Sequence, residues 1–257
     1  MYLSVKGLTI SFGGLTAVED LSFELEKGRI VSIIGPNGAG KTTTFNLVTG
    51  FKKPDRGSIV FQDQELVGLA PYKVAQKGIT RTFQKTNVFP NVTVLEAVAM
   101  GRYRRIQNSF FDILTVSKKY RRTEQETRTK GLEILDFLGL AKRKDVQAKS
   151  LSYGELRLLE IAIALAAEPE LLLLDEPAAG MNPAEAERVM GIISRINEQG
   201  LTVLLVEHNM DVVMNISDHI VVLDHGRKIC QGPPSLVQED ECVLEAYLGR
   251  GFLDAKD

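Results

Sequence analysis

The 257-residue sequence predicts an α/β fold with a parallel core sheet, an N-terminal antiparallel β subdomain and an inserted helical subdomain. Three observations support this class. The apolar run Ile30–Ile34 leads directly into a glycine-rich loop, the leucine run 171–174 ends in two acidic residues, and strand-like runs are lacking between about 85 and 167. Short continuous apolar runs are typical of parallel strands buried on both faces. We therefore expect one domain, 1–257, whose core comprises 1–84 and 168–257.

The expected elements follow in order along the chain. Before about residue 25, apolar and polar residues alternate around the turn Phe12-Gly13-Gly14, which predicts antiparallel strands, and a further strand is expected at 58–61. Helical spacing at 94–100 and 131–138 flanks a strongly polar stretch, 118–130. After the insert we expect strands at 171–174, 202–206 and 220–223, a helix after Pro183, and a hairpin at Asp224-His225-Gly226.

The segment GPNGAGKT, residues 35–42, fits the phosphate-loop pattern of a glycine, four free positions and Gly-Lys-Thr. Its glycines permit positive φ, so backbone N–H groups can converge on phosphate oxygens at the positive end of the next helix. Lys41 is expected to reach the β and γ phosphates and Thr42 to hold Mg²⁺. The alternative, a ligand-free turn, is disfavoured by the preceding strand. The predicted nucleotide-binding loop comprises Gly35, Pro36, Asn37, Gly38, Ala39, Gly40, Lys41, Thr42 and Thr43.

Two acidic residues follow the leucine run, at the strand end where α/β sheets place their ligands. We expect Asp175 to orient Mg²⁺ through a coordinated water, and Glu176 to take a proton from the water that attacks the γ phosphate. Taken alone, such a pair is more often a solvated strand end. The phosphate loop upstream makes the functional interpretation the stronger one.

The segment LSYGE, residues 151–155, has two compatible interpretations. Ser152 followed by Glu155 and an apolar run is a capping box, in which each side chain satisfies a backbone donor at a helix start. The same N-terminus, with Ser152 and the Gly154 backbone exposed, is also an anion site suited to a γ phosphate. The capping box explains every residue except Gly154.

Taken together, these motifs resemble those of one protein family. GPNGAGKT, LSYGE, LLLLDEP and His208 after the strand 202–206 are similar, in this order, to the nucleotide-binding subunits of ATP-binding-cassette (ABC) transporters, over essentially the whole chain. The resemblance implies a P-loop NTPase with a RecA-like core, a helical signature subdomain at about 85–167, and hydrolysis of ATP. It also implies that ATP lies between two chains, so that Ser152 and Gly154 act on the ATP of the other chain.

The resemblance also assigns roles to single residues. It implies that Phe12 stacks on adenine, that Gln84 lies in the loop linking ATP to the membrane partner, and that His208 contacts the γ phosphate. Considered singly, the three could be a core aromatic, a loop amide and an ordinary histidine. The implied catalytic residues are Glu176, His208, Lys41 and Gln84, and the implied Mg²⁺ ligands are Thr42, Gln84 and Asp175.

Longer segments, FGGLTAVEDLSFEL, GITRTFQ and EPAAGMNP, are similar to the ATPases of branched-chain amino-acid importers. Urea and short-amide importers have closely similar ATPases, so the solute stays open. The implied partners are membrane permease subunits, a second ATPase that is either a copy or a paralogue, and indirectly a solute-binding protein. Nucleic acid is not among the implied partners.

Two other functions remain as hypotheses: a soluble ABC protein acting on nucleic acid, and a regulatory nucleotide-binding module. The absence of an NKxD motif argues against a GTPase.

Composition adds modest limits. Hydrophobic residues make up 44% of the chain and charged residues 25%, as in soluble globular proteins. The start of the chain lacks signal-peptide features and no apolar run approaches membrane-spanning length, so we expect a protein that is cytoplasmic or at most peripheral. The family resemblance implies a peripheral position at the cytoplasmic face of the membrane. From Lys85 to Lys149, fourteen Lys or Arg stand against seven Asp or Glu, which fits either an anionic partner surface or a solvated helical face. Cys230 and Cys242 have no metal-ligand spacing and are expected to be free thiols.

Four positions depart from the usual pattern of the family. Tyr153 and Glu155 replace Gly and Gln of the commonest signature, Ile163 stands where Arg is frequent, and Asn182 replaces a common Asp. Asn182 also has a local explanation, because it precedes a proline and an acidic first turn and is therefore a good helix N-cap.

Overall fold

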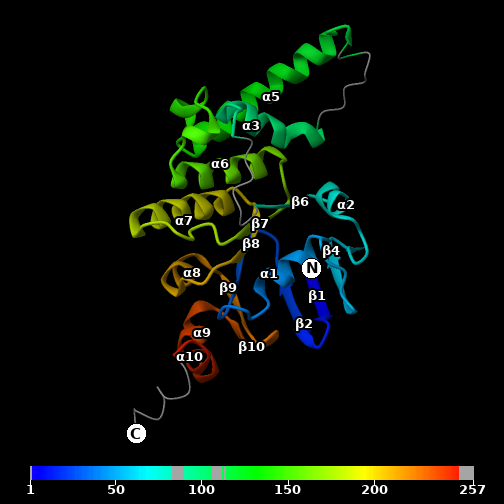
Figure 1. Cartoon of the computed structure of the whole chain (residues 1–257), viewed down its shortest axis with the longest axis vertical. Helices are drawn as coiled ribbons and strands as arrows, with labels where there is room; N and C mark the ends of the chain where they lie inside the picture. The colour runs from blue at the N-terminus through cyan, green and yellow to red at the C-terminus, as the bar shows by residue number, and fades with distance from the viewer. Residues whose placement is uncertain (1, 83–89, 106–111, 113, 249–257) are drawn as a thin grey trace.

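A computed structural model describes residues 2–82, 90–105, 112 and 114–248 of the chain. Within these ranges the fold combines two sheets and a set of helices, as Figure 1 shows. The α/β class expected from the sequence is confirmed. No helix among the described ranges has both the length and the apolar character needed to span a bilayer.

The larger sheet has six strands in the order β10-β9-β3-β8-β7-β6. The five strands from β9 to β6 are parallel, and β10 pairs with β9 in the antiparallel sense. Every residue of β3, β7 and β8 is buried, as their continuous apolar sequences predict. The strands are β3 (Ile30–Ile34), β6 (Ile79–Arg81), β7 (Leu171–Asp175), β8 (Thr202–Val206), β9 (His219–Asp224) and β10 (Arg227–Gly232).

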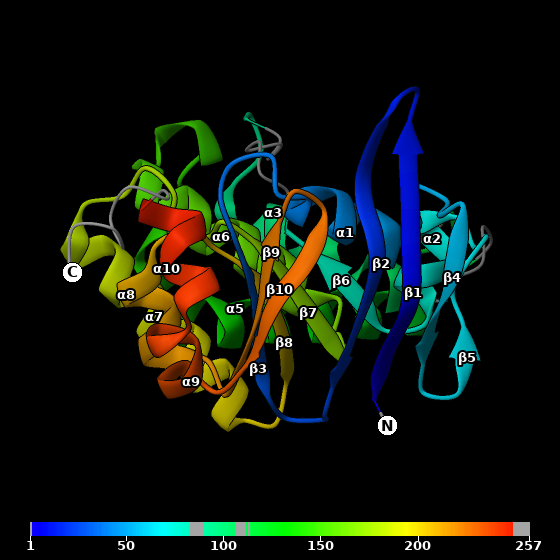
Figure 2. The ribbon, with the colours of Figure 1, turned by 90° about the horizontal axis from the view of Figure 1, so that it is seen from below.

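The smaller sheet is antiparallel, in the order β2-β1-β4-β5. It stands beside the parallel sheet in Figure 2 and confirms the antiparallel strands expected before residue 25 and at 58–61. Phe23 and Phe61 from this sheet share a hydrophobic cluster with Phe45 of the helix α1. The elements here are β1 (Leu3–Phe12), β2 (Leu15–Leu25), β4 (Arg56–Phe61), β5 (Gln64–Glu65), α1 (Lys41–Val48) and α2 (Pro71–Gln76).

Alternation along the parallel strands divides the core into layers. Leu171 and Leu173 face the cluster that contains α1 and the antiparallel sheet, whereas Leu172 and Leu174 face the cluster that contains α6 (Tyr153–Ala166) and α7 (Pro183–Glu198). Successive strand residues point to opposite faces, so one leucine run serves both layers. A third cluster joins the β9 side of the sheet to the C-terminal helices. These helices are α8 (Met210–Ile216), α9 (Pro234–Glu239) and α10 (Glu241–Leu248).

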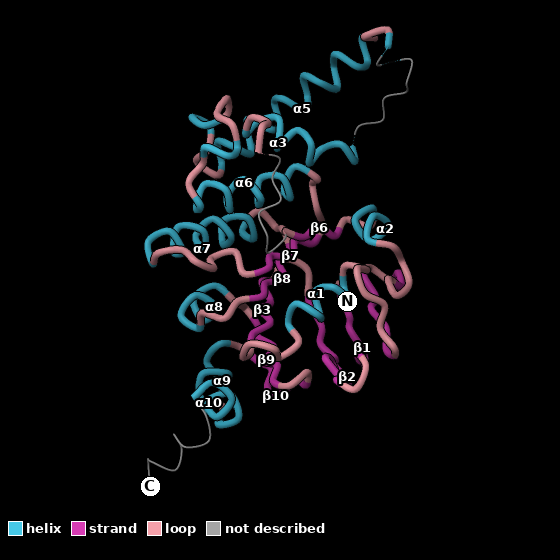
Figure 3. The backbone as a smooth tube through the Cα atoms, in the orientation of Figure 1, coloured by secondary structure: helices cyan, strands magenta, loops and turns pink. Residues whose placement is uncertain are grey.

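The inserted region is helical in the parts that the structure describes. Figure 3 shows its helices gathered in one layer, apart from the strands. The helices are α3 (Val94–Gly101), α5 (Lys118–Phe137) and α6 (Tyr153–Ala166), with short 3₁₀ turns at Arg102–Arg105, Ala141–Arg143 and Ala148–Ser150. One hydrophobic cluster runs from Val94 and Leu135 in this layer to Leu172 in the sheet, so no gap in the core marks a boundary, and the division at about 85 and 167 stays a prediction.

The helix-start predictions are confirmed. Ser152 caps α6, with its Oγ accepting from Glu155 N (3.3 Å) and Glu155 Oε2 accepting from Ser152 N (3.0 Å). Asn182 caps α7 in the same way, and Pro183 occupies the first helical position. Each cap satisfies backbone donors that the first turn leaves unpaired. The departure at Asn182 from the usual family pattern is therefore compatible with a stable helix start.

Three adjacent strands end where the candidate site begins. Ile33 pairs with Val206, and Asp175 pairs with Val206 from the other side. The residues after β3, β7 and β8 therefore emerge side by side at one edge of the sheet. Parallel sheets commonly bind ligands at this carboxyl edge. The topology thus brings together the phosphate loop, Glu176 and His208, which lie far apart in sequence.

Candidate nucleotide site

The phosphate loop adopts a conformation that only glycine accommodates at two positions. Gly35 has φ +149°, and a Cβ there would lie 2.0 Å from Leu223 O. Gly40 has φ +100°, and a Cβ there would lie 2.5 Å from Ala17 O. A side chain at either glycine would collide with backbone. The loop is therefore pressed against the β9–β10 hairpin and the start of β2, with the first turn of α1 directly after it.

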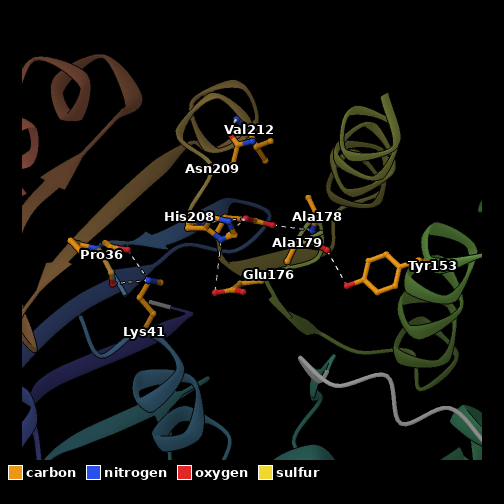
Figure 4. Close-up of polar contacts among 11 residues, drawn as sticks. Pro36, Lys41, Tyr153, Glu176, Ala178, Ala179, His208, Asn209 and Val212 are labelled. Atoms are coloured by element: carbon orange, nitrogen blue, oxygen red, sulfur yellow. Dashed lines mark hydrogen bonds and ion pairs between the residues drawn. The ribbon is translucent and has the colours of Figure 1, made fainter. Parts of the chain in front are cut away.

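Lys41 is held over its own loop. Its Nζ donates to Gly35 O (2.7 Å) and Pro36 O (3.0 Å), as Figure 4 shows. Burial lowers the pKa of Lys41, while the nearby carboxylates, Glu176 foremost, oppose that shift. The ammonium group thus lies at the loop, where the sequence pattern places a phosphate contact.

A cavity of about 340 Å³ opens beside this loop. Glu176 reaches the cavity from the end of β7, which places a carboxylate opposite the loop. His225, to which sequence analysis gave no role, also borders the cavity from the β9–β10 turn. The cavity is lined by Leu15, Thr16, Ala17, Asn37, Gly38, Ala39, Gly40, Lys41, Thr42, Thr43, Glu176 and His225.

Asp175 has a partner that the sequence did not reveal. Arg81 Nη2 lies 2.6 Å from Asp175 Oδ2, and the two side chains are 7% and 0% exposed. The second oxygen, Asp175 Oδ1, is buried without a hydrogen-bond partner. A buried carboxylate oxygen left without a donor suits a role toward a cation or its bound water, so the chemistry of Asp175 is compatible with the predicted Mg²⁺. Thr42 lines the cavity, whereas Asp175 is not among its lining residues.

Glu176 and His208 face each other across the strand ends. His208 Nδ1 lies 4.0 Å from Glu176 Oε1, and Glu176 N donates to Val206 O at 2.9 Å. Glu176 adopts φ +49°, an uncommon conformation for a residue with a side chain. The Glu176 side chain is 18% exposed and that of His208 53%, so both remain open to a ligand. The predicted base and the predicted γ-phosphate contact are therefore brought together.

Glu207 is a second residue that the sequence analysis missed. Its side chain is 1% exposed, and its oxygens accept from Ala178 N (3.0 Å) and His208 N (3.1 Å). Burial raises the pKa of Glu207, although both backbone donors oppose the shift. A glutamate directly after a fully apolar strand was the available signal. Its importance depends on which loops approach it, and the sequence does not show that.

The LSYGE segment lies away from this cavity. In Figure 4, Lys41 and Tyr153 lie on opposite sides of Glu176. Neither Ser152 nor Gly154 occurs among the described residues that line the phosphate-loop cavity. The two predicted phosphate-binding segments, GPNGAGKT and LSYGE, therefore do not form one site within this chain.

One predicted contact, Phe12, is not among the described residues that line the cavity, and another, Gln84, cannot be placed. Phe12 ends β1 with 44% exposure, which rules out a core position, and Lys52 Nζ lies 5.4 Å from its ring centroid. Phe12 is not among the cavity-lining residues, so stacking on adenine stays a prediction. Gln84 and the segment around it lie outside the described residues.

Comparison with known proteins identifies the family. The family model of the ABC transporter matches residues 18–179. The high-affinity branched-chain amino acid transport ATP-binding protein LivG of Escherichia coli K12 is 42% identical over 248 residues, which are 96% of this chain and 97% of LivG. The chain belongs to the ABC transporter ATP-binding family. A model named for branched-chain amino acid ATP-binding cassette transporters also matches residues 227–252 of this ABC chain.

Solved structures of ABC cassettes share the fold. The ADP conformation of an ATP-binding cassette of an ABC transporter aligns with a TM-score of 0.85 and 34% identity, covering 97% of this chain and 99% of that one. A dimeric cassette in a post-hydrolysis state, bound to ADP and Pi, aligns with a TM-score of 0.76 and 25% identity, covering 90% and 98%. The ABC family resemblance and the ATPase class expected from the sequence are thereby confirmed.

Proposed function

We propose that this chain is the ATP-hydrolysing subunit of an ABC importer for branched-chain or related amino acids. One observation carries the chemical part of the proposal: a single cavity joins the phosphate loop, Lys41 and Thr42 to the carboxylate of Glu176. The 42% identity to LivG supports the importer and the class of solute. A urea or short-amide importer is the alternative solute assignment.

The proposed chemistry depends on positioning and charge. Lys41 and the loop amides hold the triphosphate. Glu176 accepts the proton of the attacking water, and His208, 4.0 Å from Glu176, contacts the γ phosphate. Thr42, Asp175 and Gln84 would hold Mg²⁺, which supplies charge neutralisation at the phosphates.

We propose that a second chain completes the site. Ser152 and Gly154 lie at the start of α6, outside the cavity of their own chain, at a helix N-terminus suited to an anion. The dimeric cassette bound to ADP and Pi supports an arrangement in which two chains enclose the nucleotide. ATP would then be held between the phosphate loop of one chain and α6 of the other.

The remaining assignments concern the membrane. The protein acts at the cytoplasmic face as a peripheral subunit, with permease subunits as direct partners and a solute-binding protein as an indirect one. Gln84 and the following residues, up to the start of α3 near Val94, would transmit closure of the dimer to the permease. The basic insert is available for the same partner, because Lys and Arg outnumber acidic residues there.

Mixing two inactive variants tests the shared site. Lys41→Ala damages the phosphate loop and Ser152→Ala damages the predicted contact in trans, so each homodimer should lose turnover. In a mixed dimer both defects fall in one site and the other site is intact. ATPase activity that returns on mixing supports the proposal, whereas two variants that stay inactive together would contradict a site shared between chains.

Two further measurements address catalysis and solute. Glu176→Gln should bind ATP and accumulate as a stable dimer without turnover, and wild-type turnover in this variant would remove Glu176 as the base. Uptake of labelled leucine and labelled urea should be compared in cells lacking this gene and in complemented cells. Loss of leucine uptake alone supports the amino-acid assignment, and loss of urea uptake alone replaces it with the alternative.

A further inference from the structure

The loop that follows Glu176 is held from two sides. Ala178 N donates to the buried carboxylate of Glu207, and Ala179 O accepts from the hydroxyl of Tyr153 at 3.0 Å. Figure 4 shows both bonds on neighbouring residues of this loop, with His208 at one end and α6 at the other. Residues 177–181 thus connect the predicted base to the start of the signature helix.

Glu207 suits its side of this arrangement because a carboxylate offers two acceptor oxygens. One oxygen receives Ala178 N from the loop after β7, and the other receives His208 N from the loop after β8. A buried carboxylate is costly unless its oxygens are hydrogen-bonded. An amide would present a donor to one of these N–H groups, so glutamate is the residue type that ties the two loops together.

Tyr153 is equally constrained on the other side. Its hydroxyl accepts from Arg157 Nη2 at 2.9 Å while it donates to Ala179 O. Arg157 is buried and donates a further bond to Glu160 at 2.8 Å, so its guanidinium is itself fixed on α6. The guanidinium carbon lies 5.2 Å from the centre of the Tyr153 ring. The phenol is therefore oriented from α6 toward the loop.

The backbone conformation of Glu176 depends on the loop that these two contacts hold. Its φ of +49° is uncommon for a residue with a side chain, and such conformations persist where the surrounding structure enforces them. The adjacent turn is closed by a bond from Ala179 N to Glu176 O at 3.1 Å. Ala179 thus makes both contacts: its carbonyl oxygen accepts from the Tyr153 hydroxyl, and its N–H donates to Glu176 O.

We propose that Glu207 and Tyr153 are positioning residues that hold loop 177–181 between them and so couple the placement of Glu176 to the start of α6. The coupling rests on the proposed function, because Ser152 and Gly154 at that start act on the ATP of the partner chain. Docking of α6 on the partner's ATP would then change the placement of Glu176, the base of the chain's own site. Closure of one half of the dimer therefore raises the rate of hydrolysis in the other half without being required for it.

The first test compares Tyr153→Phe with the control Tyr72→Phe, an exposed tyrosine on α2. Loss of the hydroxyl removes its bond to Ala179 O and the bond that it accepts from Arg157. The change should lower kcat about fivefold and leave the ATP dissociation constant within about twofold, because these bonds orient the base rather than the nucleotide. The Hill coefficient for ATP should also fall toward one. Wild-type kcat and cooperativity in Tyr153→Phe would overturn the proposal.

The second test asks whether both residues act through the same loop. Glu207→Gln should lower kcat, and the exposed Glu239→Gln serves as its control. In the double variant Tyr153→Phe/Glu207→Gln, the fold-reduction in kcat should be smaller than the product of the two single reductions. Effects that multiply fully would show two independent defects. If kcat and ATP affinity fell equally, and in proportion to the fall in thermal stability, both residues would have only a structural role and the proposal would be overturned.

Hydrogen exchange on the nucleotide-free chain tests the loop itself without reference to ATP. Peptides spanning 177–181 should exchange faster in Tyr153→Phe and in Glu207→Gln than in the wild type and in both controls, because each substitution releases one side of the loop. Unchanged exchange would overturn the proposed support. A wild-type chain that never hydrolyses ATP would instead overturn the proposed function and, with it, the coupling, while the exchange result would still decide whether the loop is held.

Discussion

Arg81 and Asp175 form a buried ion pair beside the phosphate loop, with 2.6 Å between Arg81 Nη2 and Asp175 Oδ2. Arg81 Nη1 also donates to Asn46 Oδ1 of α1 at 2.7 Å. One guanidinium therefore joins β6, the end of β7 and the helix that begins at Lys41. This contact aligns the proposed magnesium ligand with the phosphate-binding helix.

The Arg81–Asp175 pair predicts a large loss of stability on removal of one partner. Arg81→Met should lower the free energy of unfolding by about 3–5 kcal/mol, because it leaves a buried carboxylate without its counter-charge. The control is Arg227→Met, which breaks the exposed pair with Glu19 and should cost far less, because solvent screens that pair. Urea unfolding measures both. Equal losses in the two variants would contradict the role given to burial.

Glu207 predicts a pH dependence of stability. Burial raises its pKa above the ordinary 4.5, so its contribution to stability is fully present below pH 4.5 and is lost as the pH rises through the higher, folded-state pKa. The unfolding free energy of the wild type, measured relative to Glu207→Gln, should therefore fall as the pH increases from about 4 to 7. Urea unfolding at several pH values checks this. A difference between the two proteins that does not vary with pH would refute the assignment.

Gly35 predicts a steric failure of the phosphate loop. Gly35→Ala places a Cβ 2.0 Å from Leu223 O, so it should destabilise the chain and abolish ATP binding. The control is Gly191→Ala on α7, where a Cβ meets nothing within 4 Å and alanine should stabilise the helix by about 0.5–1 kcal/mol. Thermal unfolding and nucleotide titration separate the two outcomes. Retention of ATP binding in Gly35→Ala would show that the loop can move away.

The two cysteines should differ in reactivity. Cys230 is buried, and burial raises the pKa of its thiol to about 11, whereas Cys242 is exposed. Since the thiolate is the reactive form, a thiol reagent at neutral pH should modify Cys242 quickly and Cys230 only after unfolding. Mass spectrometry of the native and denatured protein identifies the modified residue. Rapid modification of Cys230 in the folded chain would contradict its burial.

Local patterns predicted much of this molecule. The sequence predicted the strand Ile30–Ile34, the leucine strand and the caps at Ser152 and Asn182. Each of these depends on residues that are neighbours in the chain. The short strand β6 and the helices α8 to α10 were not identified. β6 has three residues and takes its support from pairing with β7, so its sequence alone carries a weak signal.

The sequence by itself determined that this chain carries a phosphate loop, paired acids after a buried strand and a capped signature helix, because those features are short and contiguous. The tertiary structure decided which of them meet. It placed Glu176 in the cavity of the phosphate loop and left Ser152 outside it. It also paired Arg81 with Asp175 across 94 positions and buried Glu207 between two loops. Such contacts arise from strand order and register, which depend on the packing of the whole sheet rather than on any local run of residues.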